Sequence, residues 1–133
     1  FIPEGFTSPG GGAPVDRTGN FLRNAPENAY NVLVRYEHEL SNGAGMRYQA
    51  DFRHKDEVFQ DPDNLEFAKV PEYDIADFRI VYSSPGDSGY EITGWVKNAF
   101  DEEYLLHNFP VQGSGFATPA APRTYGITIG WRR

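Results

Sequence analysis

The stretch Pro122-Arg123-Thr124-Tyr125-Gly126-Ile127-Thr128-Ile129-Gly130-Trp131 is the part of this chain that decides its fold. Side chains alternate between the two faces of a β-strand, with a period of two residues. One face of this stretch would therefore carry Tyr125, Ile127, Ile129 and Trp131. The other would carry Thr124, Gly126, Thr128 and Gly130. The pattern predicts a strand with one apolar face and one face of small or polar residues.

Four upstream runs share this alternation, at residues 29–40, 46–59, 72–84 and 90–100. In the first, Tyr30, Val32, Val34 and Tyr36 lie on one face, while Arg35, Glu37 and Glu39 lie on the other and Leu33 is the exception. In the third, Ala76, Phe78, Ile80 and Tyr82 oppose Asp77, Arg79 and Val81. The sequence predicts five strands of about 11–13 residues, longer than the usual 5–6, in a consecutive antiparallel meander.

The segments between these runs alternate in length. Residues 41–44 and 85–89 are short turns, whereas residues 60–71 and 101–122 are long breaks that contain Gly and Pro. Residues 1–28, with Pro3, Pro9, Pro14, Pro26 and the run Gly10-Gly11-Gly12, are predicted to be a loop. Short turns on one side and long loops on the other are typical of transmembrane β-barrels. The expected organisation is a loop over residues 1–28 followed by barrel strands over residues 29–133.

Composition narrows the class of protein. The 133 residues correspond to one domain and begin at Phe1, without an apolar run long enough for a signal sequence, so we expect a processed chain or part of a longer one. A net charge of −7 argues against nucleic acid as a partner. The absence of cysteine excludes disulfides and thiolate sites within this sequence. An aromatic content of 15%, with 14 Gly and 10 Pro, favours β structure over helix.

Alternation alone does not distinguish a soluble sandwich from a barrel in lipid, and the sandwich is the commoner structure. Strand length and aromatic placement favour the barrel, because interfacial aromatic girdles lie where strands leave the bilayer. The aromatic residues near the predicted strand ends on the apolar face are Tyr30, Tyr36, Phe52, Tyr82, Tyr90 and Trp131.

The closing stretch also resembles a known signal. Thr124-x-Gly126-x-x-Ile129-x-Trp131 is similar to the terminal pattern by which bacterial outer-membrane barrels are recognised for assembly. A second resemblance is carried by the stretches Asn24-Ala25-Pro26-Glu27, Lys97-Asn98, Asp101-Glu102-Glu103-Tyr104 and the lead-in Pro122 to Gly126. Through them, residues 19 to the end resemble the closing segment of a TonB-dependent receptor. The arginines after Trp131 depart from the pattern, which usually ends at an aromatic residue.

The resemblance implies the last five strands of an outer-membrane receptor that imports a ferric siderophore, cobalamin or carbohydrate. Its implied partners are outer-membrane lipid, the barrel-assembly machinery, the remaining barrel strands and plug, and the TonB energy-transducing complex through parts not present here. Five strands do not close such a barrel, since the smallest use about eight. The alternative is a structural module that pairs its open strand edges with copies of itself.

The sequence contains weaker indications of metal binding and catalysis. His38 and His54 are expected near strand ends on the apolar face, and His107 in a loop. Asp56, Glu57, Asp61, Asp63 and Asn64 offer oxygen ligands of the type calcium takes, without the full calcium-loop spacing, so calcium binding stays open. Cross-strand ion pairs explain Asp51, Asp77 and Glu91 before catalysis does. We expect no enzymatic activity, cofactor or metal site, and substrate-binding residues are not identified.

Overall fold

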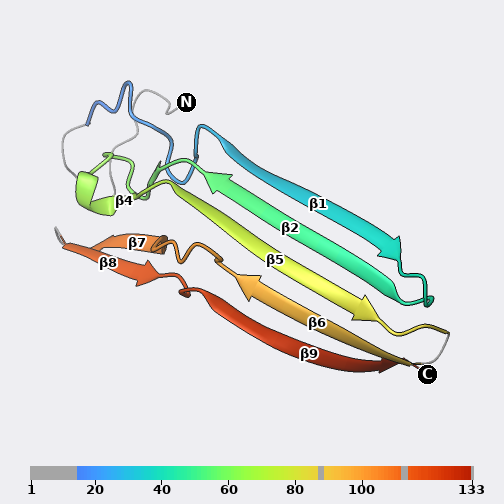
Figure 1. Ribbon diagram of the computed structural model, residues 1–133. Coiled ribbons are helices and arrows are strands. Elements are labelled where there is room, and N and C mark those ends of the chain that lie inside the picture. The colour runs from blue at the N-terminus through green and yellow to red at the C-terminus, as the bar shows by residue number, and fades with distance from the viewer. Residues whose placement is uncertain (1–14, 87–88, 112–113, 133) are drawn as a thin grey trace.

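The chain forms one long five-stranded sheet with an irregular cap at one end (Figure 1). The computed structural model describes residues 15–86, 89–111 and 114–132. The sheet contains β1 (Ala29–Glu39), β2 (Gly45–Lys55), β5 (Tyr73–Ser83), β6 (Gly89–Lys97) and β9 (Thr124–Arg132). Their order is β1-β2-β5-β6-β9, and each pair of neighbours is antiparallel. The predicted all-β meander is confirmed.

The strands are shorter than the sequence predicted, at 9–11 residues. β2 ends at Lys55, and the last residues of the predicted run form β3 (Val58–Phe59), which pairs with β4 (Lys69–Val70). β6 ends at Lys97 because Asn98 adopts a positive φ of 51° and its side chain accepts a hydrogen bond from the backbone N–H of Glu102, at 2.8 Å. Local side-chain to backbone bonding of this kind competes with a strand ladder.

The short turns lie at the end of the sheet opposite the cap, together with the C-terminal end of β9 (Figure 1). Between β1 and β2, Gly43 has a φ of +80° and its N–H donates to the Leu40 carbonyl at 2.8 Å. Asn42 closes the same turn by accepting a hydrogen bond from the Ala44 N–H at 3.1 Å. A residue without a Cβ adopts this backbone region without strain.

The cap consists of residues 15–28, residues 56–72 and the hairpin of β7 (Leu105–Val111) and β8 (Ser114–Pro119). The sequence predicted a break over residues 101–122, which is wrong for this hairpin, and it placed His107 in a loop although His107 lies in β7. The 3₁₀ turn η1 (Glu66–Ala68) leads into β4. Residues 15–28 form neither helix nor strand, as predicted; the prediction for Pro3 to Pro14 lies outside the described residues.

Buried apolar side chains are concentrated in the cap and at its junction with the sheet. Val58, Phe59, Ala68 and Val70 are buried in the cap, and Ile75 of β5 is buried close to it. The sheet itself has no second layer among the described residues, and β1 exposes every residue except His38, which is half-buried. The described residues contain no helix that is long and apolar enough to cross a membrane.

Candidate functional site

The most extensive feature of the described chain is one continuous apolar face of the five-stranded sheet. The strand register places Val34, Ala50, Phe78, Val96 and Tyr125 in one row across all five strands. The next row along the strands holds Tyr36, Tyr48, Ile80, Gly94 and Ile127. Ile127 is 75% exposed and Val34 is 60% exposed. One face thus carries Val34, Phe78, Ile80 and Ile127, as the alternation of their runs predicted.

Aromatic side chains lie toward the two ends of this apolar face. At the cap end Tyr30 stacks on His54 with ring centroids 4.8 Å apart, and it also contacts Phe52. At the turn end His38 stacks on Tyr48 with ring centroids 5.8 Å apart and is tilted against Tyr36, while Tyr90 lies edge-on to Trp131 at 6.0 Å. Exposed aliphatic residues of the same face include Val32, Val34, Ile80, Ile127 and Ile129, and the row of Val34 also carries the aromatic residues Phe78 and Tyr125. Aromatic and aliphatic side chains thus cover this face along the whole length of the strands.

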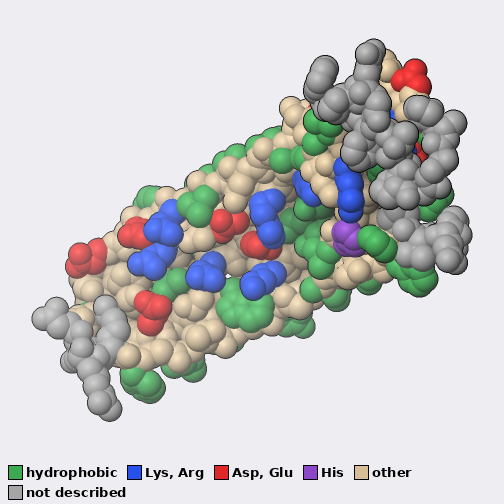
Figure 2. All heavy atoms as spheres, turned by 180° about the vertical axis from the view of Figure 1, so that it is seen from behind, with side chains coloured by type: hydrophobic (Ala, Val, Ile, Leu, Met, Phe, Trp, Pro, Cys, Tyr) green, Lys and Arg blue, Asp and Glu red, His purple; other side chains and the backbone are tan. Residues whose placement is uncertain are grey.

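The opposite, polar face carries the charged residues that the sequence placed there (Figure 2). Arg47 donates to Glu37 across β1 and β2 at 2.7 Å, and Arg53 donates to Asp77 across β2 and β5 at 3.1 Å. Gln49 bridges Arg35 and Asp51, at 3.3 and 2.8 Å. Asp77 therefore has the predicted cross-strand ion pair, whereas Asp51 bonds to Gln49 of its own strand and Glu91 accepts from the Ser83 hydroxyl at 3.3 Å.

The four predicted assembly-signal residues fall on both faces of β9. Ile129 pairs with Ile92 and Trp131 with Tyr90 on the apolar face, whereas Thr124 pairs with Lys97 on the polar face. Gly126 lies opposite Trp95, and a Cβ at Gly126 would come within 2.6 Å of the Trp95 ring. Gly126 therefore provides the space in which the indole of Trp95 lies against β9.

The outer strands β1 and β9 each pair with a single neighbour among the described residues. Each therefore presents one edge of backbone N–H and C=O groups to whatever adjoins the sheet. An unpaired edge is a template for another strand. The order of strands means that closure into a barrel, or growth into a larger sheet, would take place at β1 and β9.

Residues quoted for the receptor resemblance meet at the junction of β6 and β9 with the cap. Asp101 accepts a hydrogen bond from the backbone N–H of Arg123 at 2.7 Å, and its φ is 58°. The side-chain amide of Asn98 donates to the carbonyl of Glu102 at 2.9 Å. These polar residues fix where the long connection leaves β6 and where it enters β9.

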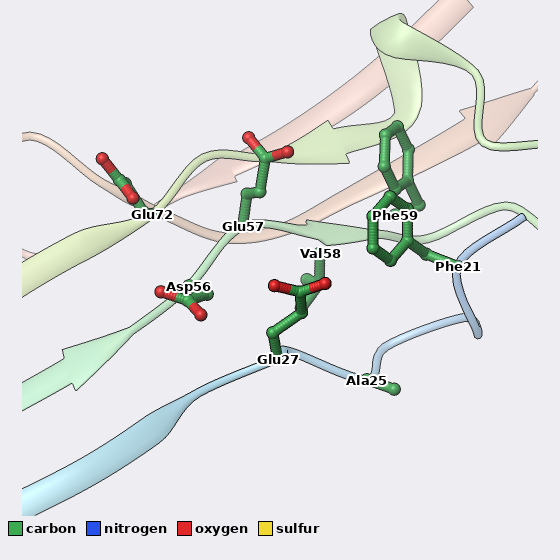
Figure 3. A pocket seen from close by; sticks show the side chains of 8 residues that line it. All are labelled: Phe21, Ala25, Glu27, Asp56, Glu57, Val58, Phe59 and Glu72. Atoms are coloured by element: carbon green, nitrogen blue, oxygen red, sulfur yellow. The ribbon is translucent and has the colours of Figure 1, made fainter.

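The cap contains a cavity of about 270 Å³ between the N-terminal loop and residues 56–72 (Figure 3). Phe21 and Phe59 stack at one side with ring centroids 5.9 Å apart. The lining also contains four carboxylates, those of Glu27, Asp56, Glu57 and Glu72. No local sequence pattern predicts this cavity, because its lining comes from three separate segments, residues 21–27, residues 56–59 and Glu72.

Two of these carboxylates already have partners. Asp56 is bonded to His54 at 2.8 Å and accepts from the backbone and side-chain nitrogens of Asn28, also at 2.8 Å. The hydrogen bond to His54, and next those from Asn28, hold the pKa of Asp56 below its usual value. The ammonium of Lys69 lies 3.1 Å from Glu57 and 3.2 Å from Glu66, and these contacts raise the pKa of Lys69.

The possible calcium ligands in residues 56–64 make separate contacts. Asp61 accepts from the Asp63 N–H at 2.7 Å, and Asp63 forms an ion pair with Arg17. The side chain of Asn64 binds both backbone groups of Phe21. Within the described ranges, no three His, Asp or Glu side chains are grouped so as to hold a metal ion. Asp63 and Asn64 instead attach the N-terminal loop to residues 56–72, while Asp61 bonds within its own turn.

Asn108 is a structural residue that the sequence did not reveal. It is 8% exposed, its side chain donates to the carbonyls of Phe67 at 2.7 Å and Lys69 at 3.0 Å, and its N–H donates to Gln60 at 3.1 Å. The β7–β8 hairpin is thus bonded to residues 60–69. A polar residue in an irregular stretch carries no periodic pattern from which such long-range bonds could be predicted.

Comparison with known proteins finds no protein-family model, no curated protein and no solved structure that matches this chain.

Proposed function

We propose that the chain forms the last five strands of a TonB-dependent outer-membrane receptor that imports a scarce nutrient. The observation that carries the proposal is the single-layer sheet whose exposed apolar face is continuous across all five strands. A contiguous apolar surface larger than a few hundred Å² on a soluble protein marks a membrane or protein interface. In this proposal lipid covers the apolar face and the polar face lines the barrel interior.

The dimensions and the ends of the sheet support this placement. The strands are 9–11 residues long, which matches the roughly 9–11 residues that a tilted transmembrane strand needs. Short turns lie at one end and the cap formed by the long connections lies at the other (Figure 1). In outer-membrane barrels the short turns are periplasmic and the long loops extracellular. The cap would then face the medium, where substrate is captured.

The open edges of β1 and β9 define what must complete the receptor. Further strands, from the same or a separate chain, would pair with β1 and β9 to close the barrel around a plug. The energy-transducing complex would act through that plug. The residues that support the family assignment are Thr124, Gly126, Ile129 and Trp131 together with the junction of Asn98, Asp101 and Arg123.

The same open edges favour the second candidate, a structural module that assembles by edge pairing between copies. In that case the apolar face would be covered by protein. A sheet of this kind requires a cover in either case, because exposed aliphatic and aromatic side chains leave a large hydrophobic free energy unsatisfied.

Site-specific labelling separates the two candidates, since the described chain contains no cysteine. The complete protein is expressed in a Gram-negative host with Ile80→Cys or Arg79→Cys and labelled with a small fluorophore. Brominated acyl chains should quench the label at position 80 and leave that at position 79 unaffected. Equal lack of quenching at both positions, in a protein absent from the outer-membrane fraction, would reject the receptor and favour the module.

The receptor proposal also requires a much longer gene product and an assembled barrel. Intact mass of the native protein should exceed that of the 133 residues by several hundred residues. The folded barrel should migrate differently on gels before and after heating. A native mass close to that of this chain, with a soluble multimer, is the result expected for the module.

A further inference from the structure

The polar face carries a local excess of cations that cross-strand pairing does not neutralise. Arg47 and Arg53 have acidic partners on neighbouring strands. Arg35 donates to the neutral amide of Gln49, and neither Arg79 nor Lys97 forms an ion pair with a described residue. The chain as a whole has a net charge of −7, so this concentration of positive charge runs against the composition.

The strand register brings these cations together at the middle of the sheet. Arg35, Gln49, Arg79, Trp95 and Gly126 form one row across the five strands. Neighbouring strands are about 4.8 Å apart, so the backbones of Arg35 and Arg79 are separated by roughly 10 Å. Figure 2 shows Lys and Arg side chains gathered along the centre of this face.

Trp95 supplies a flat aromatic surface within the cationic row. Its indole lies over Gly126, where any Cβ would clash with the ring at 2.6 Å. The ammonium of Lys97 is 5.9 Å from the Trp95 ring centroid. Trp95, Arg79 and Lys97 also line a shallow cavity of about 70 Å³. An aromatic surface thus lies beside Lys97 and opposite Arg79 of the neighbouring strand.

The two carboxylates at this cavity do not cancel its charge. Asp77 accepts from Arg53 at 3.1 Å and from the backbone N–H of Asn98 at 2.8 Å. Asp51 accepts from Gln49 at 2.8 Å. Asp77 is therefore paired with Arg53, and of the two carboxylates only Asp51 offsets the cations Arg35, Arg79 and Lys97, so a net positive charge is left.

We propose that Arg35, Arg79, Lys97 and Trp95 form a binding site for a planar organic anion on the polar face of the sheet. The aromatic or conjugated part of the ligand would stack on Trp95, and its carboxylate or sulfonate would accept charge-assisted hydrogen bonds from the cations. Charge complementarity selects the ligand, because Arg35 and Arg79 repel a cation and form no charge-assisted pair with a neutral analogue. The inference deepens the proposed function, since in a receptor this site would lie in the aqueous interior and would favour anionic cargo.

Naphthalene-2-sulfonate tests the site directly, with naphthalene-2-sulfonamide as a neutral probe of nearly the same shape. Binding to the complete protein is measured by titration calorimetry, after heat-dependent gel mobility has shown the assembled state. The sulfonate should bind, the sulfonamide should bind at least about tenfold more weakly, and added salt should weaken the sulfonate.

Three variants and one matched control locate the binding energy. Arg79→Gln and Arg35→Gln should each weaken sulfonate binding about tenfold, the usual result of losing a charge-assisted hydrogen bond. Trp95→Leu should weaken both probes, because it removes the stacking surface. Arg47→Gln is the control, since Arg47 lies on the same face but is paired with Glu37, and it should leave binding unchanged.

Equal affinity for the two probes, or an equal loss in Arg79→Gln and Arg47→Gln, would overturn the site. If the barrel assembles but the sulfonate does not bind, the inference falls and the receptor proposal stands. If the protein is a soluble multimer, the receptor proposal falls, and the same titration on the multimer decides the site.

Discussion

Phe78→Arg is the substitution that most directly tests whether lipid covers the apolar face. Phe78 is the central residue of the 11-residue strand β5 and is 42% exposed. If β5 spans the bilayer, this position lies at its midplane, where an arginine costs about 2–4 kcal/mol. A cost of 3 kcal/mol corresponds to roughly a hundredfold change in the folding equilibrium. In water, a substitution on an exposed surface usually changes stability by less than about 0.5 kcal/mol.

The control for this experiment is an arginine placed at other positions along the strands, which would lie at other depths in the bilayer. Val34 is central in β1 and lies in the same cross-strand row as Phe78, so Val34→Arg should cost as much. Tyr30, near the start of β1, would lie at the interface, where the charge itself costs about 0–1 kcal/mol. The free energy of unfolding is measured by denaturant titration of the complete protein in lipid vesicles.

Two results would refute the reasoning. A cost below about 0.5 kcal/mol for both central arginines would exclude lipid contact at that row. Normal assembly of Phe78→Arg together with failure of Arg79→Leu would show that the two faces have been assigned to the wrong surroundings.

Three further predictions concern the last strand and the cap. Deleting Trp131–Arg133 should abolish outer-membrane assembly, whereas deleting only Arg132–Arg133 should be tolerated; Arg133 lies outside the described residues. Heat-dependent gel mobility measures the assembly. A folded barrel that is unchanged after loss of Trp131 would reject the terminal signal. The pKa of Asp56 is lowered in the folded state, so its carboxylate stabilises the cap at pH above the unfolded pKa and loses this effect as pH falls through the folded pKa. The melting temperatures of the parent and of Asp56→Asn should therefore differ near neutral pH and converge in acid. A difference in melting temperature that does not depend on pH would contradict this. Asn108→Ala should lower cap stability by about 1–3 kcal/mol, because buried carbonyls lose their donors, and hydrogen exchange of the β7–β8 hairpin should accelerate; unchanged exchange would show that these bonds do not hold the hairpin.

The amino-acid sequence by itself determined the sheet. Period-two alternation in five runs specified which residues share a face, and turn residues such as Gly43 specified which neighbours pair. Both patterns are local, so they can be read from neighbouring residues without knowledge of distant contacts. Strand ends were less well predicted, because an apolar residue such as Val58 falls in step with the apolar positions of β2 while belonging to the cap core.

Only the tertiary structure decided the cap and the cationic row. The cap depends on hydrogen bonds such as those of Asn108 to residues about 40 positions away, which no local pattern encodes. The cationic row depends on register, because Arg35, Arg79 and Trp95 come from three different strands and a shift of one residue would reverse their faces. Alternation tells which face a side chain occupies, but hydrogen-bonded pairing alone determines which side chains meet there.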